Sequence, residues 1–240
     1  VIAVDLFGQP ADYDALGVIA EREDLFVLGD GAQSFGATLN GKKVGCLADV
    51  STTSFFPAKP LGCYGDGGAL FTDDDDIAVI ARSIRQHGKG QQKYEIDRVG
   101  LNSRLDTLQA AVLLAKLVVF EDEIENRRRV ASAYDQALND DVIIPAVLPG
   151  AKSVWAQYTV RTKCRDQLAA HLKTAGIPSA VYYPRPMHLQ GAYLAFGAGE
   201  SSLQVSERLS QEVLSLPMHP YLPSEEVERI GEIVCSFEHS

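Results

Sequence analysis

The stretch that decides the fold is residues 50–68, VSTTSFFPAKPLGCYGDGG. Its first part, 50–56, is rich in Thr, Ser and Phe, which favours a strand. Two prolines and several glycines end this strand and lead into a second one, predicted at 68–72. Lys59 therefore follows a strand directly. In open α/β sheets, ligands bind beyond the carboxyl ends of the strands, so Lys59 is a candidate functional residue.

The residues before and after this stretch alternate between strand and helix patterns. Buried strands are predicted at 2–6 and 26–28, with a helix capped by Asp12 between them. A further helix is predicted from Asp73 to about residue 86. Strands separated by helices imply parallel pairing and an α/β layer fold. Because neither a methionine nor a lead-in precedes the first strand, we expect further sequence upstream.

The second half of the chain has a different texture. A long helix is predicted over 105–134, followed by a segment rich in turn residues. A small α+β domain is then predicted from strands at 155–162 and 179–183 and helices at 165–174, 206–214 and 224–237. We therefore divide the chain into part of a large domain (1–120), a connecting helix and linker (121–150) and a small C-terminal domain (151–240).

The composition limits the functions that the chain can have. Apolar residues make up 46% of the 240 residues, which is enough for a core, and the formal net charge is -10. An acidic chain repels phosphate backbones, which argues against nucleic acid and anionic membranes as main partners. A locally basic pocket for a nucleotide-linked substrate remains compatible with this charge. The longest apolar run, 108–120, is too short to span a bilayer.

The cysteines and histidines predict no metal site. The four cysteines form no CxxC pair, so we interpret them as reduced, buried thiols of a cytosolic protein. The five histidines lack metal-ligand spacing. The run 73–76, four aspartates, lacks the alternating ligands and closing Glu of a calcium loop, and a solvated helix start is the better interpretation.

Three polar side chains lie at predicted strand ends. Lys59 is flanked by Phe, Pro and Leu, which we expect to desolvate its amine partly and so to favour its attack on an aldehyde. Asp30 follows the strand at 26–28, where a carboxylate can hold a protonated ring nitrogen. The Ser54 hydroxyl can hold a phosphate oxygen. The plainer alternatives are a surface lysine, a turn aspartate and a strand serine bonded to the backbone.

Together, an amine, a carboxylate and a hydroxyl at successive strand ends form the pattern that a pyridoxal phosphate site needs. The carboxylate keeps the pyridine nitrogen protonated, and the hydroxyl holds the phosphate. The lysine forms a Schiff base and then moves a proton. Residues 102–106, at a predicted helix start, are either ordinary N-cap residues or an anion site with Arg104 as its fork.

These motifs resemble, in their order along the chain, those of the DegT/DnrJ/EryC1/StrS sugar aminotransferases. The likeness covers essentially the whole chain and is carried by GDGAQSFGA (29–37), SFFPAKPLG (54–62), GDGGA (65–69), NSRLD (102–106), QAA (109–111), YYPRPMH (182–188) and LSLPMHP (214–220). The resemblance implies a type I, aspartate aminotransferase-like fold and pyridoxal 5'-phosphate as cofactor. It also implies a cytoplasmic homodimer with shared active sites.

The resemblance further implies roles for individual residues. Lys59 would be the Schiff-base lysine, and Asp30 the partner of the pyridine nitrogen. Gln33 would contact the cofactor ring near its hydroxyl, and Ser54 would bind the phosphate. Asn102 would reach the phosphate of the cofactor in the neighbouring subunit.

Within the family, KPLGCYGD (59–66) and NSRLDTLQ (102–109) are most similar to 3-aminotransferases that act on UDP-linked 3-keto-hexuronic acids. Arg104 would then hold the substrate carboxylate as a planar fork. Tyr182 and Tyr183 would line the sugar pocket. The reaction would move an amino group, usually from glutamate, to the keto-sugar for polysaccharide or lipopolysaccharide synthesis.

The chain departs from the family pattern in two respects. The N-terminal region, with a Gly-Thr-type loop that binds the phosphate, is absent, so we expect this 240-residue chain to fold poorly or bind the cofactor weakly. Ala58 stands where relatives often carry Ser or Thr. The alternatives are an inactive regulatory or binding relative, and a 4-aminotransferase for another nucleotide keto-sugar. Related sugar dehydratases carry histidine in place of the lysine, and Lys59 argues against that function.

Overall fold

The computed structural model describes residues 1–92, 94–138 and 142–237. The chain forms two compact units. Unit 1 comprises Val1–Glu125 and Val147–Ala156, and unit 2 comprises Asn126–Ala146 and Gln157–Ser240. Residues 139–141 of the predicted linker and 238–240 of the predicted small domain lie outside the described residues. The domain boundaries at 120 and 150 stay a prediction.

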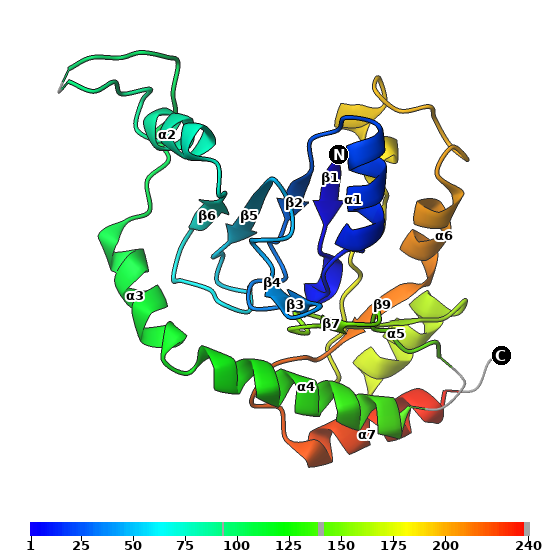
Figure 1. The fold of residues 1–240 in the computed structure, drawn as a ribbon. Helices are drawn as coiled ribbons and strands as arrows, with labels where there is room; N and C mark the ends of the chain where they lie inside the picture. The colour runs from blue at the N-terminus through cyan, green and yellow to red at the C-terminus, as the bar shows by residue number, and fades with distance from the viewer. Residues whose placement is uncertain (93, 139–141, 238–240) are drawn as a thin grey trace. The chain divides into compact units, whose positions relative to one another are not determined.

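Unit 1 is built on a four-stranded sheet of order β1-β2-β5-β6 (Figure 1). Its strands are β1 (Ile2–Val4), β2 (Leu28–Asp30), β5 (Val50–Ser54) and β6 (Gly68–Phe71). The first three strands are parallel, with Val4 opposite Asp30 and Asp30 opposite Thr52. Their carboxyl ends therefore meet at one edge of the sheet.

The connection from β1 to β2 confirms the predicted helix. After the 3-10 turn η1 (Leu6–Gly8), helix α1 (Tyr13–Arg22) lies beside β1 (Figure 1). The Asp12 carboxylate accepts a hydrogen bond from the backbone N–H of Ala15 at 3.0 Å. This cap satisfies one of the N–H groups that have no partner within the helix.

Three details of the sheet correct the prediction. The first strand is not buried, because β1 lies at the sheet edge and leaves Ile2 66% exposed. The second strand begins at Leu28 and includes Asp30, whereas Phe26 is exposed. Strand β6 runs antiparallel to β5, because no helix connects the two strands and a parallel pair requires a crossover.

The single helix predicted over 105–134 is wrong. The structure has α3 (Thr107–Leu117) and α4 (Phe120–Ala137), and the N–H of Val119 bonds the carbonyl of Lys116 between them. Phe120 and Ile124 are buried in the core of unit 1. No Pro or Gly marks the break, so the apolar pattern continues through it. The predicted helix after Asp73 is confirmed as α2 (Asp75–Ile84) with Asp74 as its cap.

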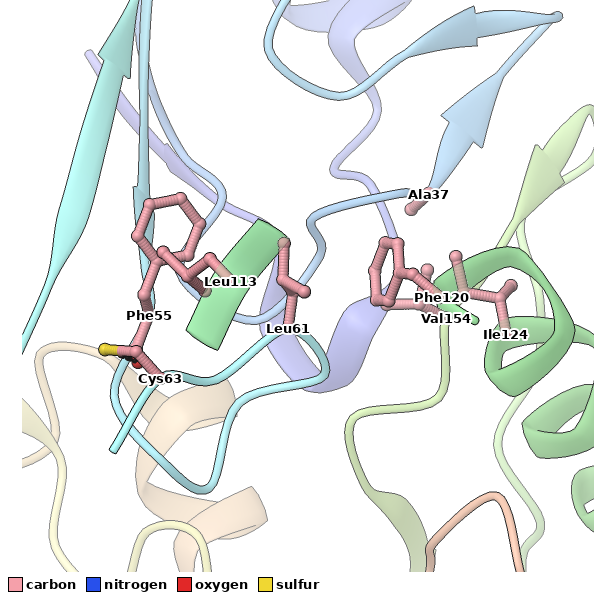
Figure 2. Packing of buried hydrophobic residues seen from close by; sticks show 8 residues of the cluster. All are labelled: Ala37, Phe55, Leu61, Cys63, Leu113, Phe120, Ile124 and Val154. Carbon is pink, nitrogen blue, oxygen red and sulfur yellow. Dashed lines mark hydrogen bonds between the residues drawn. The ribbon is translucent and has the colours of Figure 1, made fainter. Parts of the chain in front are cut away.

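The core of unit 1 includes residues on both sides of the segment that carries Lys59. Figure 2 shows the buried cluster of Ala37, Phe55, Leu61, Cys63, Leu113, Phe120, Ile124 and Val154. Phe35 packs against it, with its ring centroid 5.7 Å from that of Phe120. A three-stranded sheet of β3 (Thr38–Leu39), β4 (Lys42–Lys43) and β7 (Ala151–Lys152) completes the unit.

Unit 2 contains a two-stranded antiparallel sheet and three helices of its own among the described residues. They are β8 (Tyr158–Arg161), β9 (Val213–Leu216), α5 (Arg165–Thr174), α6 (Gln204–Glu212) and α7 (Ser224–Cys235), with 3-10 turns η2 (Met187–Leu189) and η3 (Gly191–Tyr193). Tyr134 and Tyr158 are fully buried and stack at 4.7 Å. The Tyr134 hydroxyl donates to the carbonyl of Pro217 at 2.8 Å.

Several predictions for unit 2 need correction. Residues 179–183 form no strand and contribute only the bridge between Ala180 and Ser215. The predicted helix 206–214 runs into β9, which contains Leu214. Ser224 is the first residue of α7 and not its cap. The helix 165–174 is confirmed as α5, whereas the strand predicted over 155–162 shortens to β8.

The cysteines do not all fit the buried-thiol interpretation. Cys63 is buried, Cys164 and Cys235 are partly covered, and Cys46 is exposed. Within the described part of the chain, no helix is both long and apolar enough to cross a membrane. The same residues contain no cluster of three or more His, Cys, Asp or Glu side chains arranged to hold a metal ion.

Glu207 of α6 holds together a segment of unit 2. Its carboxylate accepts a hydrogen bond from His188 Nε2 at 2.9 Å and from the backbone N–H groups of Ser201 and Leu203. The His188 hydrogen bond is the main cause that lowers the pKa of Glu207 below its usual 4.5. A carboxylate with a lowered pKa stabilises the folded state above its unfolded pKa, and this stabilisation is lost as the pH falls through the lowered value.

We therefore expect Glu207→Gln to destabilise the chain at pH 7 and to have less effect as the pH falls below 4.5. Denaturant unfolding of wild type and variant between pH 3 and 7 measures the difference. Glu200→Gln, an exposed glutamate of the same unit, is the control. A difference that is constant over this pH range would contradict the prediction.

Candidate active site

The predicted carboxylate and hydroxyl lie at the ends of neighbouring strands. Asp30 is the last residue of β2, and Ser54 is the last residue of β5. The two strands are parallel, so both side chains start from the same edge of the sheet. Lys59 follows five residues after Ser54, on the loop that leaves this edge. The sheet thus gives an amine, a carboxylate and a hydroxyl a common edge.

The loop that carries Lys59 is closed by its own backbone. The N–H of Lys59 donates to the carbonyl of Phe56 at 2.9 Å, and the N–H of Cys63 donates to the carbonyl of Phe55 at 2.8 Å. Lys59 is partly buried. Gly62 lies where a Cβ atom would be only 2.7 Å from that Phe56 carbonyl oxygen. A glycine is therefore required here because the loop passes close to its own backbone.

Two side chains of α3 hold the far side of this loop. The Lys116 ammonium donates to the carbonyl of Gly62 at 2.6 Å and lies 5.2 Å from the centre of the Tyr64 ring. The Gln109 Oε1 atom accepts the N–H of Tyr64 at 2.8 Å. From the sequence, Lys116 marks only a break in an apolar run, so its role was missed.

The side chains of Asp30, Gln33 and Ser54 also contact nearby backbone. Asp30 Oδ1 accepts from the N–H of Ala32 at 3.1 Å. Gln33 is buried, and its Oε1 accepts from the N–H of Phe7 at 2.6 Å. Ser54 Oγ accepts from the N–H of Phe56 at 3.2 Å, which is the backbone contact of the plainer alternative. This contact leaves the hydroxyl proton of Ser54 able to donate.

Asp5, which no motif in the sequence singles out, is a fully buried carboxylate next to Asp30. It lies just beyond β1, and its N–H donates to the carbonyl of Asp30 at 3.0 Å. Its side chain accepts from Ser34 Oγ at 2.7 Å, from the N–H of Ala11 at 2.8 Å and from the Tyr13 hydroxyl. Burial is the main cause that raises its pKa. The sequence does show this acidic residue inside an apolar run. Such a residue indicates a buried carboxylate, and a buried charge needs hydrogen-bond partners.

The remaining predicted residues lie elsewhere. Asn102 and Arg104 do not start a helix, because α3 begins at Thr107 after Asp106. Asn102 instead bridges Gln86. Tyr182 and Tyr183 belong to unit 2, with their ring centroids 5.6 Å apart.

A hollow of about 550 Å³ in unit 1 lies between α1 and the segment before β5. Its lining includes Val27 and Asp49, which precede β2 and β5. The hollow therefore reaches the amino ends of these strands, opposite the edge where Asp30 and Ser54 lie.

The chain belongs to the DegT/DnrJ/EryC1/StrS aminotransferase family, whose model matches residues 1–235. It is 48% identical, over 98% of its length, to the UDP-2-acetamido-2-deoxy-3-oxo-D-glucuronate aminotransferase of Pseudomonas aeruginosa. It is also 44% identical, over 99% of its length, to the pleiotropic regulatory protein of Geobacillus stearothermophilus. The chain spans 64% of the length of each of these two relatives.

Solved structures confirm the predicted fold class. A DegT DnrJ EryC1 StrS aminotransferase from Brucella abortus matches with a TM-score of 0.94 and 50% identity, over 98% of this chain and 63% of that one. The S. venezuelae protein DesV, solved in complex with a ketimine intermediate, matches with a TM-score of 0.93 and 39% identity, over 97% and 63% of the two chains. The chain therefore has the α/β fold of these sugar aminotransferases.

Proposed function

We propose that this chain is the greater part of a pyridoxal-phosphate-dependent aminotransferase that transfers an amino group from glutamate to a nucleotide-linked keto-sugar. The observation that carries the proposal is the shared sheet edge from which Asp30, Ser54 and the Lys59 loop start. Ligands of open α/β sheets bind at such an edge. Family membership and the named activity of the P. aeruginosa relative support the same reaction.

The chemistry of these side chains fits the three polar parts of pyridoxal phosphate. Lys59 would carry its aldehyde carbon covalently, Asp30 would pair with the ring nitrogen, and Ser54 would donate to the phosphate. Gln33 would contact the ring near its hydroxyl. When bound, the cofactor supplies an electron sink for the carbon that exchanges its amino group. The Lys59 amine would then move a proton between that carbon and the aldehyde-derived carbon of the cofactor.

The substrate that we propose is a UDP-linked 3-keto-hexuronic acid derivative. Arg104 would hold its carboxylate through two parallel hydrogen bonds, and Tyr182 and Tyr183 would line the sugar pocket. The name of the P. aeruginosa relative supports an oxidised uronate. We further propose a cytoplasmic homodimer in which Asn102 serves the neighbouring subunit's cofactor, and a role in polysaccharide or lipopolysaccharide synthesis.

A second candidate function is a regulatory or binding protein without catalysis. The observation that favours it is the 44% identity to a pleiotropic regulatory protein. In that case the chain would bind its ligand but would not release 2-oxoglutarate from glutamate.

The test is to add pyridoxal phosphate to the 240-residue chain, record its absorbance, and then add glutamate. An aminotransferase forms a lysine-bound cofactor band and releases one 2-oxoglutarate per loaded site. The same chain joined to the part of the P. aeruginosa relative that it does not match separates weak cofactor binding from none. A band without 2-oxoglutarate would favour the regulatory function, and no band in either protein would reject the cofactor.

Arg104→Gln is expected to raise the KM for the uronic acid substrate by about tenfold or more, because charge-assisted hydrogen bonds to the carboxylate are lost. The KM for a matched keto-sugar without a carboxylate should not change. Arg82→Gln, on the exposed side of α2, is the control. Equal increases in KM for both sugars would show that Arg104 does not bind the carboxylate.

A further inference from the structure

The turn at residues 30–34 connects β2 to the residues that follow it and carries two proposed cofactor contacts, Asp30 and Gln33. Within the turn, the N–H of Ser34 donates to the carbonyl of Gly31 at 3.2 Å. Strand β5 also holds the start of the turn, because the N–H of Gly31 donates to the carbonyl of Thr52 at 2.8 Å. Further contacts come from the segment directly after β1.

Asp5 supplies these contacts from two directions. Its N–H donates to the carbonyl of Asp30 at the start of the turn, at 3.0 Å. Its carboxylate accepts the hydroxyl of Ser34 at the end of the turn, at 2.7 Å. Two residues further on, the N–H of Phe7 donates to Gln33 Oε1. The segment 5–7 therefore fixes both ends of the turn and the side chain between them.

Asp5 is itself held rigidly. It is 0% exposed and also accepts from the N–H of Ala11 and from the Tyr13 hydroxyl. The Tyr13 hydroxyl oxygen lies where it would be 2.8 Å from a Cβ atom at Gly29, beside Asp30. A buried carboxylate with several donors loses much of its stabilisation when one is removed.

We propose that Asp5 is a positioning residue that fixes the turn 30–34 and thereby aims Asp30 and Gln33 at the cofactor. The contact of Asp30 and Gln33 with the cofactor rests on the proposed function. The effect of Asp5 on the geometry of the turn does not depend on it. Asp5 acts through Ser34 and through the main chain of Asp30 and makes no contact with the reacting atoms. A purely structural residue would instead stabilise unit 1 as a whole.

The first test is hydrogen exchange of the cofactor-free, 240-residue chain. In Ser34→Ala and Asp5→Asn, the amides of residues 32 and 34 are expected to exchange about tenfold faster than in wild type. The amide of residue 31, which donates to the carbonyl of Thr52 in β5, and the rest of unit 1 should change little. Asp49→Asn is the matched control, because Asp49 accepts the N–H of Val27 in the same unit at the other end of β2. Unchanged exchange in the turn, or an equal rise over the whole unit, would overturn the proposal.

The second test is the dissociation constant of pyridoxal phosphate, measured by absorbance titration. It is expected to rise about tenfold in Ser34→Ala and further in Asp5→Ala, with Asp5→Asn in between because the amide keeps one acceptor. Ser34→Ala removes a single hydroxyl and keeps the test decisive if the Asp5 variants do not fold. Faster exchange in the turn without a change in this constant would overturn the positioning role. Absence of cofactor binding by both the wild-type chain and the protein that joins it to the unmatched part of the P. aeruginosa relative would reject the proposed function, and hydrogen exchange would still decide whether Asp5 fixes the turn.

Discussion

Replacing Lys59 by alanine is expected to abolish covalent attachment of pyridoxal phosphate and to lower the rate of amino-group transfer by at least about 10³-fold. Both effects have one cause, because the same amine would bind the cofactor and move the proton. The fold should change little, since Lys59 lies on a loop and is only partly buried. Borohydride reduction followed by peptide mapping locates the modified lysine, and a coupled assay measures the rate.

Lys42→Ala is the control for this substitution, because Lys42 is an exposed lysine of the same unit, in β4. It should leave both the attachment and the rate unchanged. If Lys59→Ala were labelled stoichiometrically at another lysine, the cofactor would be attached there, and the assignment of Lys59 as its attachment site would be wrong. Full activity of Lys59→Ala would contradict it as well.

The sequence predicts those parts of the fold and site that depend on local patterns. Asp12 before an apolar helix face predicts α1 and its cap, and the strand before two prolines predicts β5. Because Asp30, Ser54 and Lys59 each lie at or just after a strand, a rule about strand ends is enough to select them. None of these inferences requires knowing which residues far apart in the sequence are neighbours.

The sequence fails where distant contacts decide the structure. Asp5 looks like part of an apolar strand until the turn at Ser34 and the helix at Tyr13 are placed beside it. Lys116 looks only like a break in an apolar run until the carbonyl of Gly62 is placed beside it. The break between α3 and α4 follows from the burial of Phe120, which a repeat of apolar residues does not specify.

Gly62→Ala is expected to destabilise the chain by roughly 2–3 kcal/mol and to raise the dissociation constant of pyridoxal phosphate by about 100-fold. A Cβ atom at this position would lie 2.6 Å from the carbonyl oxygen of Pro57 and 2.7 Å from that of Phe56. The Phe56 oxygen accepts the N–H of Lys59, so any shift that relieves the clash also moves the turn that carries the amine.

The loop cannot relieve this clash by moving residue 62 instead. Leu61 and Cys63 on either side are 2% and 0% exposed, and Figure 2 shows both side chains in the buried cluster. The carbonyl of Gly62 is also bound by Lys116. Because a closely packed interior resists local movement, the backbone must shift instead on the less buried side of the loop, where Lys59 lies.

Gly17→Ala separates this effect from the general effect of replacing glycine. Gly17 lies within α1, where an added Cβ atom meets nothing within 4 Å, so alanine there should stabilise the chain by about 0.5–1 kcal/mol. Denaturant unfolding and cofactor titration of both variants measure the two effects. If Gly62→Ala lowered stability but kept wild-type cofactor affinity, Gly62 would contribute only to the stability of the core. The inferred link between the close contact at Gly62 and the position of Lys59 would then be wrong.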